Sequence, residues 1–161
     1  MDTTKKLVEI LAGFESAMLV TQRPDDQLTA RPMAVAQVTD DGGIWFMTEG
    51  DSGKMSDLAV HREVCVTMQG GRRFAALCGT VEVSADRGKI SELWNESWRV
   101  WFPAGKDDPR LVLLHVVPSY GEYWDNSGTE GIKYMLKAGK AYLQGKTPEI
   151  TESTHAKVSL R

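Results

Sequence analysis

Short strand-like runs that end in glycine or proline turns are the feature that most limits how this chain can fold. One run, residues 44–48, follows Asp-Asp-Gly-Gly at 40–43, a turn whose glycines supply the positive φ that a tight hairpin needs. Other runs cover residues 17–21, 28–39, 64–68, 74–84, 111–117 and 120–124. No strand–helix–strand rhythm recurs. We therefore expect about seven strands in antiparallel hairpins, forming a small closed or partly open barrel.

Short stretches with the spacing of amphipathic helices flank these strands. They cover residues 3–14, 55–59, 86–98 and 130–144. The chain has 161 residues, the length of one ordinary domain. We expect a mainly β domain over residues 1–145, in which the helices cover a barrel. Residues 146–161 are polar and predict a C-terminal tail with poor order.

Composition excludes several classes of protein. Apolar residues make up 42% and charged residues 25% of the chain, which is globular rather than disordered. The net charge is −3 with no basic stripe, so a nucleic acid is not an expected partner. No apolar run approaches the roughly 18 residues of a membrane span, and the N-terminus lacks a signal peptide's apolar core. These features predict a cytoplasmic protein in which Cys65 and Cys78 are buried, reduced thiols.

One loop has the residues of an anion site. The segment from Thr48 to Lys54 ends a strand and opens a helix, where free backbone amides, the Ser52 hydroxyl and the Lys54 ammonium can all face a phosphate. Arg31, in the neighbouring strand, can add a bidentate clamp. The spacing is not that of a P-loop. The alternative interpretation is a capped helix whose charges are solvated.

Tryptophan is concentrated in one part of the chain, since four of the five tryptophans lie between Trp94 and Trp124. Trp94 and Trp98 are four residues apart, which predicts one helical stripe packed on the barrel. Trp101 and Trp124 lie outside that helix and are better candidates for stacking on a flat ligand. Plain packing is the alternative for each of them.

The sequence offers no group that performs acid–base or nucleophilic chemistry unaided. The histidines His61, His115 and His155 are scattered without a zinc spacing, and no nucleophile elbow occurs. We therefore predict no metal site. A cofactor that brings its own reactivity is the better hypothesis.

Several segments, in order along the chain, resemble the general stress protein branch of the pyridoxamine 5′-phosphate oxidase-like, FMN-binding split-barrel superfamily. They are Leu28–Val35, Trp45–Thr48, Ser52–Lys54, Trp101–Pro109 and Glu122–Asp125. The resemblance spans roughly residues 5–145. It implies a six-stranded antiparallel split β-barrel and a homodimer that binds FMN in clefts at the subunit interface.

The resemblance also implies a role for individual residues. Arg31 and Lys54 would grip the FMN phosphate with help from Ser52. The segment Pro32, Met33 and Ala34 would present its backbone along the isoalloxazine edge, Met47 and Thr48 would contact the polar tail or the ring edge, and Trp124 would pack near the flavin from the partner subunit.

Departures from the oxidases limit the expected activity. Ala36 stands where true pyridoxamine phosphate oxidases carry a lysine, and residues 127–134 contain none of the arginine and histidine groups that hold the substrate there. Phe74 replaces a glutamine that contacts the flavin. The resemblance therefore favours an FMN-dependent, oxidoreductase-like general stress protein acting with a small-molecule donor or acceptor. The alternatives, in order, are a flavin-binding module without turnover (a reservoir or regulatory dimer), a true oxidase of pyridoxamine phosphate, and a haem-handling split-barrel protein.

Overall fold

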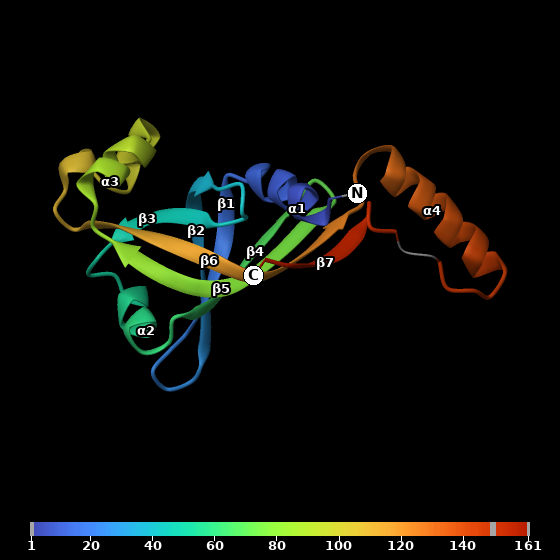
Figure 1. Ribbon diagram of the computed structural model, residues 1–161, viewed down its shortest axis with the longest axis horizontal. Helices are drawn as coiled ribbons and strands as arrows, with labels where there is room; N and C mark the ends of the chain where they lie inside the picture. Colours follow the sequence, from blue (N-terminus) through green and yellow to red (C-terminus); the bar gives the residue numbers. More distant parts are fainter. Residues whose placement is uncertain (1, 149–150, 161) are drawn as a thin grey trace.

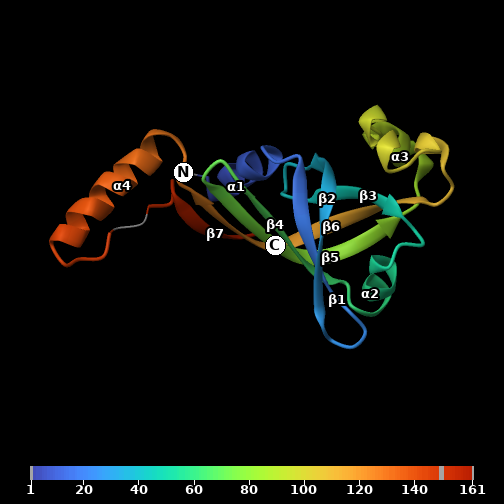
Figure 2. The same ribbon diagram turned by 180° about the vertical axis from the view of Figure 1, so that it is seen from behind.

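The computed structural model describes residues 2–148 and 151–160 as a barrel with helices at both ends (Figures 1 and 2). The strands are β1 (Ser16–Gln22), β2 (Leu28–Val38), β3 (Ile44–Glu49), β4 (Glu63–Gly70), β5 (Arg73–Ser84), β6 (Leu111–Asp125) and β7 (His155–Ser159). The helices are α1 (Thr3–Ala12), α2 (Lys54–Val60), α3 (Arg87–Leu93) and α4 (Gly128–Leu143), with 3-10 turns η1 (Glu96–Val100) and η2 (Gly105–Asp107).

The strands close a six-stranded antiparallel barrel, as predicted. Their order is β3-β2-β1-β4-β5-β6, and β3 pairs back onto β6 from Ile44 opposite Val116 to Glu49 opposite Leu111. Pro32 lies in β2 where only β1 is paired, because the ladder between β2 and β3 begins at Val35. A proline lacks the amide proton that a central ladder needs, so its place on a half-paired stretch of β2 follows from the sequence.

β6 is one long strand, where the sequence suggested two. It is continuous through Pro118 because an irregularity next to Gly79 leaves Ser119 as an extra residue opposite β5. A Cβ at Gly79 would lie 2.1 Å from the carbonyl oxygen of Val117, so the backbones approach too closely for a side chain. Glycine, which has no side chain, is therefore the residue type that this position requires.

The core lies inside the barrel and under α1. Leu7, Ile10 and Leu11 of α1 are buried, and burying each such side chain contributes about 1.5–3 kcal/mol to stability. Asp2 caps the helix, since its Oδ1 accepts hydrogen bonds from the amides of Thr4 and Lys5 at 3.0 and 3.1 Å.

The tryptophan stripe expected on one helix is divided between two elements. α3 ends at Leu93, Trp94 caps it, and Trp98 lies in η1. The two indoles still pack edge to face, with ring centroids 6.2 Å apart. Trp98 belongs to a second, smaller core cluster at the α3 end of the barrel, together with Met47, Ile90, Leu111 and Leu113.

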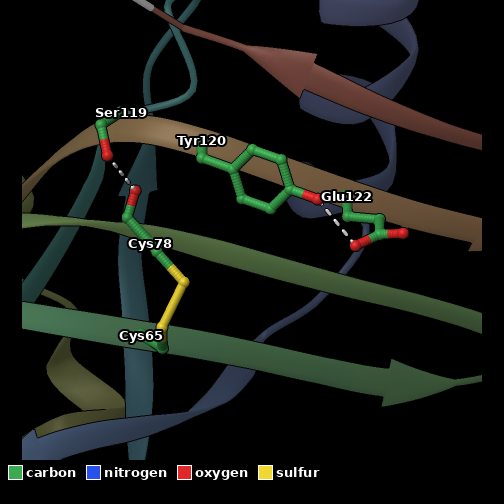
Figure 3. Close-up of a disulfide and its surroundings, with 5 residues drawn as sticks. All are labelled: Cys65, Cys78, Ser119, Tyr120 and Glu122. Carbon is green, nitrogen blue, oxygen red and sulfur yellow. Dashed lines mark hydrogen bonds between the residues drawn. A yellow bond between two sulfur atoms is a disulfide. The ribbon is translucent and has the colours of Figure 1, made fainter.

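The two cysteines form a disulfide, so the expectation of reduced, buried thiols is wrong for this structure (Figure 3). Cys65 in β4 and Cys78 in β5 are directly opposite each other in the ladder, with Cα atoms 4.3 Å apart. Both side chains are half-buried and point away from the core, since their neighbours Val64, Val66 and Leu77 fill the inside of the barrel. Sequence separation alone concealed this pairing, which depends on the register of the hairpin.

The C-terminal segment contains a strand that the sequence analysis missed. β7 pairs antiparallel with β6 from Tyr120 opposite Ser159 to Trp124 opposite His155, so residues 155–159 are not part of a poorly ordered tail. Ala156 and Val158 are buried, which gives β7 the alternation of a half-buried strand. Residues 149 and 150 lie outside the described part. No described helix is long and apolar enough to cross a membrane.

Candidate functional site

In the predicted anion loop, two hydroxyl side chains contact one ammonium group. Lys54 is the first residue of α2, and its Nζ donates to Thr48 Oγ1 at 2.8 Å and to Ser52 Oγ at 3.0 Å. Thr48 is buried near the end of β3, while Ser52 and Lys54 are half-buried. The sequence therefore identified these three residues as neighbours correctly.

The charge of Lys54 is not neutralised by an ion pair. Within residues 2–148 and 151–160, no carboxylate lies within 4.0 Å of its Nζ. Burial and the repulsion of the Arg31 guanidinium lower the pKa of Lys54, and the opposing attraction of Glu49 is smaller. Glu49 is itself engaged with Arg110, at 3.3 Å from Nη2. A half-buried cation with hydroxyl partners alone is a local excess of positive charge.

Arg31 is held in a polar network beneath this loop rather than free as a clamp. Its Nη1 donates to Thr21 Oγ1 at 2.6 Å and its Nη2 to Thr29 Oγ1 at 2.7 Å. The buried carboxylate of Asp57 lies 3.3 Å from Nη2 and accepts a second hydrogen bond from Thr21 at 2.7 Å. Asp57 therefore fixes the guanidinium and offsets part of its charge.

Sequence reasoning missed Asp57, although one signal was present. An aspartate next to Leu58, within the short apolar pattern of α2, lies on the side of the helix that faces the barrel. A carboxylate in such a position needs a buried partner. Its partner Arg31 is 26 residues away and meets it only because β2 passes next to α2.

An apolar cleft of about 430 Å³ begins where the polar loop ends. Five predicted flavin-contacting residues line it, together with side chains from β1 and from the segment around η1. The lining comprises Pro32, Met33, Ala34, Met47 and Thr48, with Glu15, Ser16, Trp98, Trp101 and Phe102. Thr48 belongs both to the cleft and to the Lys54 loop, so the polar and apolar parts of the site are continuous.

The tryptophans at the site only partly follow the sequence prediction. Trp101 lines the cleft, as expected of a ligand candidate, and Trp98 lines it as well although it was assigned to packing. Trp124 does not line this cleft in its own chain. It lies opposite Phe74 on the outer face of the barrel, and its ring stacks on His155 with centroids 5.2 Å apart.

Both the sequence and the fold are similar to those of known proteins. The sequence matches the family described as pyridoxamine 5′-phosphate oxidase like over residues 2–149. The chain belongs to this family. No curated protein matches the sequence.

Solved structures of similar proteins share the fold. A protein assigned as general stress protein 26 from Jannaschia sp. CCS1 is 28% identical, with 98% of each chain covered and a TM-score of 0.75. A protein assigned to the general stress family from Xanthomonas campestris is 30% identical over 78% of this chain and 88% of its own, with a TM-score of 0.64. A general stress FMN/FAD binding protein from Xanthomonas citri is 27% identical over 80% and 92%, with a TM-score of 0.66.

Within this pyridoxamine 5′-phosphate oxidase-like family, the chain keeps its departures from the true oxidases. Ala36 packs against the second core cluster and adds no charge to the site. The start of α4 occupies the stretch from Ser127 to Tyr134, which supplies no arginine or histidine. Within the described part of this stretch, the chain therefore supplies none of the arginine and histidine side chains that the resemblance implies for a true oxidase.

Proposed function

We propose that the protein binds FMN and acts as a flavin-dependent, oxidoreductase-like general stress protein with a small-molecule donor or acceptor. The observation that carries this proposal is the half-buried Lys54 ammonium at the end of an apolar cleft. It has two hydroxyl partners and, among the described residues, no carboxylate within 4.0 Å. A cytoplasmic location stays a prediction.

The phosphate end of FMN fits the Lys54 loop on electrostatic grounds. A phosphate would receive charge-assisted hydrogen bonds from Lys54 Nζ and the hydroxyl of Ser52, and Arg31 would add a second positive charge nearby. The bound dianion would offset the repulsion between the two cations and favour the charged form of Lys54. Asp57 keeps the Arg31 guanidinium fixed, so little side-chain entropy is lost on binding.

The ring end of FMN fits the cleft because its lining is mostly apolar. The side chains of Met33 and Met47 are buried and line the cleft. The segment from Pro32 to Ala34 lines one side of it, and the indole of Trp101 adds an aromatic surface. A bound flavin supplies hydride and electron transfer chemistry that side chains lack. The protein's own residues bind and orient the ring and exclude water from the buried side.

A homodimer is part of the same proposal, because a broad face on the outside of the barrel is suited to pack against the same face of a second copy. We call this the outer face: three rows of side chains that cross the strands and point away from the core. The middle row crosses the ladders from β2 to β6 and comprises Pro32, Met18, Thr67, Ala76 and Glu122. The row through Phe74 and Trp124 lies on one side of it, and the row through the disulfide lies on the other.

The outer face is apolar enough to associate. Met18, Phe74 and Trp124 keep 36–39% of their surface exposed, and most of their neighbours on the face are small. Pro32 borders both this face and the cleft. In a dimer that buries the face, Trp124 of the second copy is the candidate to complete the cleft that it does not reach in its own chain.

The second candidate function is a flavin-binding module without turnover. It is favoured by the lack of acid–base groups, since Glu15 is the one titratable side chain among the described residues that line the cleft. Turnover separates the two: an oxidoreductase bleaches bound FMN faster than free FMN when a donor such as a reduced nicotinamide is added. If no donor exceeds the free-flavin rate, the module is the correct interpretation.

The experiment that tests flavin binding is a titration of the protein with FMN, FAD, riboflavin and pyridoxal phosphate, followed by quenching of flavin or tryptophan fluorescence. We expect FMN to bind best. Riboflavin, which has no phosphate, should bind at least about 10-fold more weakly, the equivalent of one charge-assisted contact. Equal affinity for FMN and riboflavin would show that Lys54 does not bind the phosphate. Tighter binding of pyridoxal phosphate than of FMN would contradict the proposal that the site binds a flavin.

A further inference from the structure

α4 carries an apolar stripe that the described residues leave mostly exposed, although Arg72 Nη2 contacts Met135 Sδ at 3.5 Å. Its large apolar side chains recur at helical spacing on one side and are 55–85% exposed: Ile132, Met135, Leu136, Tyr142 and Leu143. The helix stands off the end of the barrel in both views (Figures 1 and 2). An isolated helix of this length is marginal in water, so its apolar side needs a partner surface.

The opposite end of the molecule has a matching exposed apolar surface. Val100 and Trp101, at the end of η1, are 73% and 61% exposed. Trp101 also lines the cleft, so this surface is the mouth of the proposed flavin site. α3 and its neighbouring turns lie at one end of the barrel and α4 at the other (Figures 1 and 2), so α4 cannot cover this surface in its own chain.

A two-fold dimer through the outer face brings these two surfaces together. A two-fold axis that crosses the long direction of the molecule exchanges its ends, so α4 of one copy lies at the η1 end of the other. Trp124, on the outer face, comes only a few residues before the start of α4 at Gly128. A second copy that delivers Trp124 to the cleft therefore carries α4 to the same end.

The area of the outer face supports the participation of α4. A stable interface buries roughly 800 Å² on each partner. Three rows across five strands cover only about 500 Å² at ordinary strand spacing. A stripe along a helix of 16 residues adds about 240 Å². Lys140 lies beside the stripe and Lys137 lies on the opposite side of the helix, so both stay in water when the stripe is buried.

We propose that α4 of one subunit packs its apolar stripe against Val100 and Trp101 of a second copy and closes the mouth of that copy's cleft. This inference rests on the proposed homodimer. It makes the second copy a part of each site and restricts access to small donors, because the mouth that bulky reactants would enter is covered.

Site-specific cross-linking between two differently tagged copies tests the inference. One copy carries Leu136→Cys in the stripe and the other carries Val100→Cys, and the mixed subunits are oxidised mildly in the presence of FMN. The native cysteines are disulfide-bonded and offer no competing thiol. We expect a covalent heterodimer at least 10-fold more abundant than with the control pair, in which Lys137→Cys, on the other side of α4, replaces Leu136→Cys.

The outcomes separate this inference from the proposed function. A dimer that binds FMN but gives no more cross-link with Leu136→Cys than with Lys137→Cys overturns the placement of α4 and leaves the flavin proposal standing. A cross-link that forms within single chains of a double variant also overturns it. A monomer in sedimentation that still binds FMN overturns both the dimer and the placement of α4.

Discussion

The Asp125 side chain and backbone connect four elements at the end of β6. Removing the carboxylate should lower the free energy of unfolding at neutral pH. One carboxylate oxygen lies 2.9 Å from Lys6 Nζ in α1, and the other accepts a hydrogen bond from the amide of Ser127 at 3.0 Å. Arg73 of β5 is 3.5 Å away, and the Asp125 amide bonds to Thr154 near β7. Burial opposes ionisation, but the hydrogen bonds from Ser127 and Lys6 outweigh the effect of burial and lower the pKa of Asp125 from 3.8 to about 2.

The lowered pKa predicts both a magnitude and a pH window. At about 1.4 kcal/mol per pKa unit, the difference corresponds to about 2–3 kcal/mol of stability. Because the folded pKa lies below the unfolded one, this stability is fully present above about pH 5 and is lost as the pH falls through 4 toward 2. Asp125→Asn should therefore lower the free energy of unfolding by about 2 kcal/mol or more at pH 7, since Lys6 also loses its partner.

Urea unfolding followed by tryptophan fluorescence at several pH values measures this effect. The difference between the wild type and Asp125→Asn should shrink steadily between pH 5 and pH 2.5, and Asp40→Asn, at an exposed loop position, should change little at any pH. A difference that is equal at pH 7 and pH 2.5 would refute the electrostatic reasoning. It would show that the asparagine side chain fails at this position for reasons of packing.

Two further predictions concern stability. Replacing Cys65 and Cys78 together by serine removes a cross-link between residues 13 positions apart and should lower the free energy of unfolding by up to about 3 kcal/mol. We expect a lower urea midpoint and a larger m-value, because the unfolded chain becomes less compact without the cross-link; a midpoint equal to that of the wild type would show that the disulfide does not stabilise the protein. Asp57→Asn leaves the guanidinium of Arg31 without its buried carboxylate and should cost about 3 kcal/mol in the same assay, and an unchanged midpoint would show that Thr21 and Thr29 hold Arg31 without it.

Local patterns account for the part of the fold that the sequence predicted. Strand alternation and turn residues are local, so the hairpin from β2 to β3 and the strands β4 and β5 could be read directly. The half-paired position of Pro32 and the close approach at Gly79 were equally readable, because each residue type restricts the backbone in one way. Closure of the barrel by β3 and β6 followed only from the general need to remove edges.

Features that depend on register or on distant partners were missed. The disulfide requires Cys65 to lie opposite Cys78, and a one-residue slip of the hairpin would separate the two side chains. β7 had a visible signal in the alternation of Ala156 and Val158, but its short length and polar neighbours concealed it. The Arg31–Asp57 pair joins residues that only the packing of α2 beside β1 and β2 brings together.

The central claim is that Lys54 recognises the phosphate of a bound flavin, and the ratio of FMN to riboflavin affinity tests it most directly. Lys54→Met keeps the length of the side chain and removes the charge, while Lys5→Met does the same at an exposed position on α1. We expect Lys54→Met to lower FMN affinity about 10- to 100-fold, to leave riboflavin affinity nearly unchanged, and so to reduce the ratio, whereas Lys5→Met keeps it at the wild-type value. An unchanged ratio in Lys54→Met would contradict the account.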